Sequence, residues 1–350
     1  MKNKKLSLIF AVCLGISLLA GCGSEKKETF EKAEQDLESG SYSYALEGYL
    51  ASVSNEYKLP QSYRGAGIAH LRMGNYKEAS EQFTNALNCE KVGKALEQDL
   101  LSYRATAAIK AGQYADAMAD CQTLGEEHSM NADTFYLTGM SALMLDSYEE
   151  AASNFEQAYG EDPTYDRAIQ IYEAYLEKDM EADGTRYLEA ALTTEAKNAE
   201  DHCDRGRVYY YMQDYANAQK ELIEASNQDS TEALVLLGRV YLTQNDISNA
   251  RVMYQEYISK AGNSGKGYNG LALCDIAEGN YDSALSNITS GISVATTEEM
   301  QGLLFNEIVA YEKKLDFGTA LEKAKEYLKI YPEDEAAQKE VEFLETRRGR

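Results

Sequence analysis

The sequence predicts an all-α fold built from one repeated unit of two helices. A six-residue pattern, which has glycine or a polar residue first, an aromatic residue third and alanine sixth, returns nine times with some drift along the 350 residues. The starts of successive copies lie 32 to 38 residues apart, most often 34. The composition also favours helix over strand, because it holds only 3 prolines and is rich in alanine, leucine, glutamate and glutamine.

The first 21 residues differ from the rest of the chain. Three lysines (Lys2, Lys4 and Lys5) precede an apolar run, LSLIFAVCLGISLLAG, that is shorter than the about 20 residues of a transmembrane helix. The run ends in Leu19-Ala20-Gly21-Cys22, which resembles a bacterial lipobox. The resemblance implies that residues 1–21 are a cleaved lipoprotein signal peptide and that Cys22 carries the lipid. The alternative is an ordinary secretory signal with an incidental cysteine.

Residues 22–28 are expected to be the lipidated cysteine and a short tether, and residues 29–332 the repeat array. The six-residue pattern appears as GSYSYA, GNYKEA, GQYADA, DSYEEA, KDMEAD, QDYANA, NDISNA, GNYDSA and LDFGTA, starting at Gly40, Gly74, Gly112, Asp146, Lys178, Gln213, Asn245, Gly279 and Leu315. A small residue usually stands seven positions before each copy and a bulky one nine positions after it. These spacings place both on one helical face, so each unit is predicted to be helix, tight turn, helix.

The order of small, aromatic, alanine and bulky positions resembles the tetratricopeptide repeat, whose unit has about 34 residues. Pro163 and Pro332 stand at the closing position of the fourth and ninth units. The resemblance implies a right-handed superhelical α-solenoid of about nine repeats. The fifth copy, from Lys178, matches poorly and is a candidate for a loosened joint. Residues 333–350 are expected to form a capping helix and a basic tail, since a solenoid needs a polar end.

Charge and cysteine content exclude some functions. With 58 acidic and 34 basic residues the formal net charge is −24, so nucleic acid binding is not expected. Four cysteines remain beyond Cys22, at Cys89, Cys121, Cys203 and Cys274. They lie far apart in the sequence, and we expect free buried thiols, with a Cys89–Cys121 bridge between adjacent units as the alternative.

No metal, cofactor or catalytic site is expected from the sequence. His70, His128 and His202 lie in the second, third and sixth units, and repeats in a stack contact only their neighbours. The residues of His202-Cys203-Asp204 point in different directions on a helix, so they do not form a catalytic relay. The segment GNSGKG at 262–267 lacks the spacing of a phosphate-binding loop and is predicted to be a connector.

The family resemblance implies that the first helix of each unit lines a concave surface. The outward positions of the central units hold tyrosine, methionine and arginine, the types enriched in binding interfaces. The predicted partner-binding residues are Tyr136, Met140, Met144, Tyr172, Tyr175, Arg207, Tyr210, Tyr211 and Arg239. Strong curvature that buries part of this stripe is the alternative. The family's carboxylate clamp is not matched, because Arg64, Ile68, Ser102 and Thr106 stand at its positions.

The sequence therefore predicts a non-enzymatic scaffold, lipid-anchored through Cys22 on the extracytoplasmic face of a bacterial cell membrane. Its partner would be a protein or peptide, with a peptide or a partner helix held on the concave face. One alternative is a structural accessory subunit of a cell-envelope assembly, secretion or polysaccharide machine. A less favoured alternative is an enzyme that acts on cell-wall polymers.

Overall fold

The structure, a computed structural model, describes residues 22–347. Within this range it consists of nineteen helices and no strand, which confirms the all-α solenoid with a terminal helix. Eighteen helices pair in sequence order into nine hairpins: α1 (Cys22–Glu38) with α2 (Tyr42–Ser54), α3 (Leu59–Arg72) with α4 (Tyr76–Leu87), α5 (Lys94–Lys110) with α6 (Tyr114–Glu127), α7 (Ala132–Met144) with α8 (Tyr148–Glu161), α9 (Tyr165–Leu176) with α10 (Glu181–Ala191), α11 (Ala199–Tyr211) with α12 (Tyr215–Asn227), α13 (Thr231–Thr243) with α14 (Ile247–Ala261), α15 (Gly265–Ala277) with α16 (Tyr281–Ile292), and α17 (Thr297–Lys313) with α18 (Phe317–Ile330). Helix α19 (Glu335–Arg347) follows alone.

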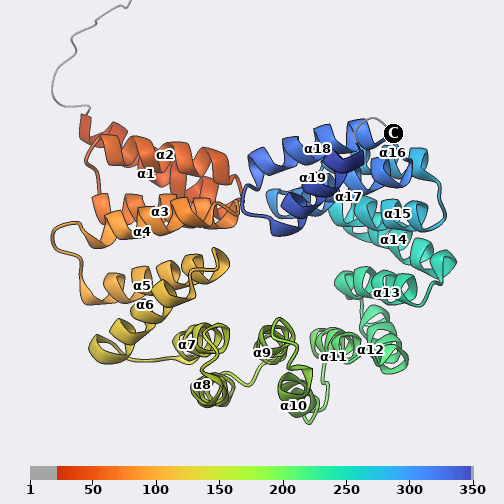
Figure 1. Cartoon of the computed structure of the whole chain (residues 1–350), viewed down its shortest axis with the longest axis horizontal. Helices are drawn as coiled ribbons and strands as arrows, with labels where there is room; N and C mark the ends of the chain where they lie inside the picture. The colour runs from red at the N-terminus through yellow and green to blue at the C-terminus, as the bar shows by residue number, and fades with distance from the viewer. Residues whose placement is uncertain (1–21, 348–350) are drawn as a thin grey trace, which may run out of the picture.

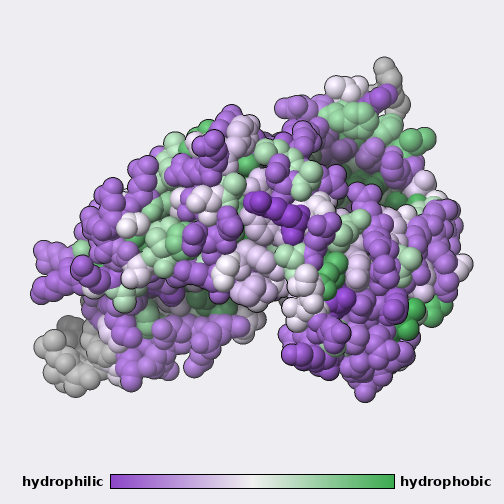
Figure 2. All heavy atoms as spheres, turned by 90° about the horizontal axis from the view of Figure 1, so that it is seen from below, coloured by the Kyte–Doolittle hydropathy of each residue, from purple (hydrophilic) through white to green (hydrophobic). Residues whose placement is uncertain are grey.

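The hairpins stack side by side in two layers (Figure 1). Each odd-numbered helix up to α17 contacts the odd-numbered helices of adjacent hairpins, and these helices line the inside of the curve. The even-numbered helices lie outside. The face of the molecule in Figure 2 is largely hydrophilic, with hydrophobic groups in small separate areas, as the acidic composition leads one to expect.

A small residue on the inner helix and a bulky residue on the outer helix hold each regular hairpin together. In the fourth hairpin, a Cβ atom at Gly139 would lie 2.7 Å from the ring of Phe155. Gly67 meets Phe83 and Gly206 meets Leu222 in the same way, at 2.5 Å in both cases. The bulky partners are fully buried. The predicted small and bulky positions are therefore confirmed as the contact between the two helices.

The turn between the two helices of a hairpin needs one residue with a left-handed backbone. Four of the nine copies place glycine there, as predicted. In the other five turns the left-handed residue carries a side chain: Asp146, Asp179, Gln213, Asn245 and Leu315, with φ between 56° and 64°. The turn geometry is thus the same in all nine hairpins, although glycine, which adopts it most easily, is absent from most of them.

The position of the left-handed residue corrects the register of the fifth unit. This residue is Asp179, so the six-residue pattern starts there and not at Lys178. In the corrected register, Tyr172 occupies the small-residue position of α9, and Gly184 replaces the pattern's alanine on α10. A Cβ atom at Gly184 would lie 2.9 Å from the Cα atom of Tyr172. Gly184 thus lets α10 approach the backbone of α9 closely, and Leu188, at the bulky position of α10, is fully buried, so the hairpin is tightly packed and not a loosened joint.

The two ends of the solenoid meet, and the array closes into a ring (Figure 1). The Thr297 hydroxyl donates to the carbonyl of Gly40 at 2.9 Å, and the Tyr42 hydroxyl donates to Glu298 at 3.0 Å. Contacts between the first and ninth hairpins contradict the expectation that repeats touch only their neighbours.

A second group of contacts joins the turn of the second hairpin to the segment between α18 and α19. Glu333 accepts a hydrogen bond from the backbone N–H of Tyr76 at 2.9 Å and pairs with Lys77 at 3.2 Å. The Tyr331 ring lies beneath the turn glycine, where a Cβ atom at Gly74 would be 3.6 Å from it. The closure therefore joins the first two hairpins to the ninth hairpin and to the segment that follows it.

The ends of the described range confirm one expectation and correct another. Helix α19 buries Ala337 and Leu344 against the ninth hairpin, as expected of a cap. Residues 22–28 belong to α1 and are not an extended tether, because the helix begins at Cys22. The predicted signal peptide, residues 1–21, and the last residues of the basic tail, 348–350, lie outside the described residues. No helix in the range 22–347 is long and apolar enough to span a membrane.

The corrected register predicts a large loss of stability for one residue on α9 and a small change for another. Tyr172→Ala removes a side chain that is 2% exposed and should lower the free energy of unfolding by about 3–5 kcal/mol. Leu176→Ala, at a position that is 45% exposed, should change it by less than about 1 kcal/mol. Urea unfolding followed by circular dichroism measures both. Equal losses in the two variants would return the fifth unit to the register that starts at Lys178.

Candidate functional site

The inner surface of the third, fourth and fifth hairpins holds a hollow of about 490 Å³. Helices α5, α7 and α9 line it with both polar and aromatic side chains. The lining residues that matter most are Asp99, Ser102, Tyr103, Asp133, Tyr136 and Arg167. The hollow thus combines hydrogen-bonding groups with two tyrosine side chains, carried by three helices.

Arg167 is the buried charge at one side of this hollow. Its side chain is only 7% exposed, and its guanidinium group donates to Gln170 at 2.9 Å and to Asp162 at 3.3 Å and also pairs with Asp133. It lies over the Tyr136 ring, 5.1 Å from the ring centroid. Burial raises the pKa of the Tyr136 hydroxyl to about 12, so this group stays a neutral donor at physiological pH. A buried arginine with this many partners is a fixed part of the wall.

Ion pairs between neighbouring inner helices repeat along the concave face. An acidic residue in the first two turns of four inner helices pairs with a basic residue of an adjacent hairpin. The pairs are Asp99 with Arg64, Asp133 with Arg167, Asp166 with Arg207, and Glu232 with Lys266. In the acid-rich chain, these basic partners neutralise the acids of the inner surface and hold the inner helices in register.

Three of the predicted partner-binding residues lie in the core. Met140, Tyr172 and Tyr175 are 6%, 2% and 2% exposed, so their side chains do not face a partner. For Tyr172 and Tyr175 the cause is the register of the fifth unit, because an error of one residue turns a helix by about 100°. For Met140 the cause is curvature, since α9 packs closely against α7 and covers this position.

The other predicted residues keep part of their surface on the concave side. Tyr136, Met144, Tyr210 and Tyr211 are half-buried, and Arg239 is exposed. The hydroxyl of Tyr211 donates to Glu173 at 2.6 Å. Tyr210 and Thr243 are joined through their hydroxyls at 3.4 Å. Arg207 is half-buried and pairs with Asp204 at 3.1 Å as well as with Asp166. Binding of a partner by these residues stays a prediction.

The sequence analysis missed the residues that line the hollow. Ser102 and Thr106 were considered only as mismatches to a carboxylate clamp, and they lie in the wall of the hollow. Asp99 and Asp133, 34 residues apart, occupy the same position in consecutive repeats. That spacing was visible in the sequence. The corrected register also adds Glu173 and Glu177, both exposed, to the concave side of α9.

The cysteines and the segment His202-Cys203-Asp204 on α11 were weighed as chemical groups in the sequence. All four described cysteines beyond Cys22 are free, with Cys121, Cys203 and Cys274 buried and Cys89 half-buried. Burial raises the pKa of the Cys203 thiol to about 11, so it is not a thiolate nucleophile near neutral pH. His202 turns away from Cys203 and contacts Glu221 on α12 at 2.6 Å.

Residues 262–264 connect the seventh and eighth hairpins, as predicted, whereas residues 265–267 form the first turn of α15. Gly262 ends α14 with φ of 84°, and Ser264 caps α15. A carboxylate already occupies the start of α15, because Glu299 accepts from the Ser264 hydroxyl at 2.8 Å and from the Lys266 backbone N–H at 3.2 Å. A phosphate group would have to displace this carboxylate.

One group of potential metal ligands occurs within residues 22–347, formed by Glu97, Glu127 and His128. The prediction of no metal site considered the three histidines only in relation to one another. It did not consider a histidine together with carboxylates of its own hairpin, which the two antiparallel helices bring close.

Comparison with known protein families finds a match to the repeated units. The family described as tetratricopeptide repeat matches residues 64–125, 103–166 and 203–265. A Dictyostelium discoideum protein described as DnaJ homolog subfamily C member 7 homolog is 23% identical over 257 residues, which cover 69% of this chain and 42% of that protein. The chain thus spans less than half the length of this curated relative.

Two solved structures illustrate the likeness in fold. Yeast Tom70 is 15% identical, with a TM-score of 0.40 and coverage of 93% of this chain and 89% of that chain. A tetratricopeptide repeat protein from Parabacteroides merdae is 19% identical, with a TM-score of 0.45 and coverage of 72% and 99%. The family match and the nine hairpins together lead to one conclusion: the chain carries tetratricopeptide repeats.

Proposed function

We propose that this protein is a lipid-anchored scaffold that holds a segment of a partner protein against its concave face. The observation that carries the proposal is the hollow of about 490 Å³ between α5, α7 and α9. It opens on the inner side of a stack of tetratricopeptide repeats, a fold that serves protein–protein interaction. Three consecutive hairpins contribute to it, which suits an extended segment or a helix that crosses several repeats.

The chemistry of the concave face indicates the kind of segment that it accepts. Asp99, Ser102 and Asp133 offer hydrogen-bonding groups, and Tyr103 and Tyr136 contribute aromatic side chains to the wall. Further along, Tyr210, Tyr211 and Arg239 add aromatic surface and one exposed cation. A partner segment that presents polar groups beside aliphatic side chains complements this surface, because tyrosine buries apolar area while its hydroxyl stays bonded.

The anchor is supported by the lipobox-like run that ends at Cys22. Because α1 begins at Cys22, no extended tether separates the proposed lipid from the first hairpin. Because the ring is closed, α17, α18 and α19 lie beside the first two hairpins (Figure 1). The closed ring as a whole would then stay near the membrane, in place of a solenoid whose later repeats extend away from it.

Site-specific photocrosslinking tests the binding face. A photoreactive residue at Ser102, in the hollow, or at Tyr210 should form adducts with a partner in intact cells. The same residue at Glu149 on α8 or at Lys220 on α12, both exposed on the outer layer, serves as the matched control and should form none. Arg239→Ala should reduce the adducts at Tyr210 several-fold. Adducts at outer positions as strong as those at Ser102 and Tyr210 would contradict the proposal.

The lipid anchor is tested at Cys22. In cells fed a labelled fatty acid, the wild-type protein should carry the label and sediment with membranes, whereas Cys22→Ala should lose both properties. Cys89→Ala, which removes a half-buried free thiol elsewhere, is the control and should behave as wild type. A Cys22→Ala protein that still carries the label would refute the proposed lipid anchor. That result would not bear on the proposed binding of a partner at the concave face.

A further inference from the structure

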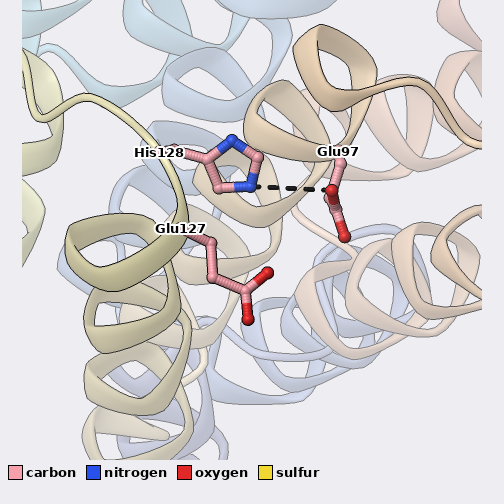
Figure 3. A group of neighbouring side chains, drawn as sticks. All are labelled: Glu97, Glu127 and His128. Atoms are coloured by element: carbon pink, nitrogen blue, oxygen red, sulfur yellow. Dashed lines mark ion pairs between the residues drawn. The ribbon is translucent and has the colours of Figure 1, made fainter.

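Three side chains converge at the end of the third hairpin that lies opposite its turn. Glu97 is in the first turn of α5, Glu127 is the last residue of α6, and His128 follows directly. Figure 3 shows the Nε2 edge of His128 turned towards Glu97, with the Glu127 carboxylate near the same gap. One potential ligand atom from each residue lies within 4.8 Å of the other two.

The Nε2 atom of His128 has no hydrogen-bond partner, although it is buried. The side chain of His128 is only 4% exposed, and the nearest carboxylate oxygen, on Glu97, is 3.7 Å away. That distance is too long for a hydrogen bond. The contact, dashed in Figure 3, is an ion pair only when His128 is protonated. Buried polar atoms are nearly always hydrogen-bonded, so a ring nitrogen that makes no hydrogen bond and faces two carboxylates indicates a ligand in the gap.

We propose that Glu97, Glu127 and His128 bind a divalent transition-metal ion of the zinc class. Zinc takes one histidine nitrogen and carboxylate oxygens at about 2.0–2.2 Å, with water in the remaining position. Ligand atoms around such an ion are about 3–4 Å apart, close to the 3.7 Å between His128 and Glu97. The nitrogen ligand favours zinc over calcium and magnesium, which prefer oxygen.

The surroundings of the three residues hold them in place before any ion binds. The side-chain amide of Gln98 donates to the carbonyl of Ser129 at 2.9 Å, which ties the first turn of α5 to the segment after His128. The backbone N–H of His128 donates to Leu124 at 3.1 Å and fixes the end of α6. A bound ion would join the two ends of the third hairpin beside the hollow, since Gln98 and Asp99 also line that hollow.

Cobalt serves as the spectroscopic probe of the site. The purified full-length protein, freed of metal with a chelator, is titrated with Co²⁺ and then with Zn²⁺. We expect one Co²⁺ per chain, with the visible absorption of a four- or five-coordinate ion and no thiolate-to-cobalt band, and we expect Zn²⁺ to displace it. Zn²⁺ but not Mg²⁺ should raise the midpoint of thermal unfolding.

Matched variants separate this site from other ligands in the chain. Glu127→Gln, at an exposed residue that the fold does not need, should weaken Co²⁺ binding about tenfold or more, and His128→Ala should abolish it. His70→Ala, which removes another histidine with an unpaired ring nitrogen, and Cys89→Ser should bind as wild type. No Co²⁺ binding by the wild type, a thiolate band that Cys89→Ser removes, or unchanged affinity in Glu127→Gln would each overturn the proposal.

Discussion

Close contact between the two helices of each hairpin is the constraint on which the rest of the structure depends. A small residue on the inner helix lets a ring or branched chain of the outer helix lie against its backbone, as Phe155 does at Gly139. Because the paired helices are held this close, each hairpin packs as one unit. Units of similar shape stack with a similar rotation from one to the next, which curves the solenoid. That curvature places the odd-numbered helices on the inside, and with them the hollow between α5, α7 and α9.

Closure of the ring follows from the same curvature when nine hairpins are stacked. In a linear stack, only contacts between neighbouring repeats stabilise the fold. In this protein, Thr297 and Glu333 also contact the turns of the first and second hairpins. Opening the ring would break these contacts and expose Tyr331 and Tyr42, both of which are buried. The closed form limits how far the concave face can flex, so a partner meets a largely preformed surface.

The fold could be predicted from the sequence, because the residues at which the two helices of a hairpin meet recur about every 34 positions. The sequence was insufficient in the fifth unit, where Tyr172 stands at the small-residue position of the inner helix and Gly184 replaces the alanine of the pattern. Only the left-handed backbone of Asp179 reveals the true register, and that shift moved Tyr172 and Tyr175 from the predicted surface into the core. Ring closure and the proximity of Glu97 to His128 could not be predicted in the same way. They depend on how separate segments lie in space, and the repeat pattern describes only positions within one unit.

The central claim, that the nine hairpins close into a ring, is most directly tested by zero-length crosslinking of Lys77 to Glu333. Their charged atoms lie 3.2 Å apart, so a carbodiimide should join them within the monomer, as it should join Lys314 to Asp282 at 2.6 Å. Lys77→Arg keeps the ion pair but removes the amine, and should lose only the first crosslink. A monomer that yields the Lys314–Asp282 product without the Lys77–Glu333 product would show that the ring is open.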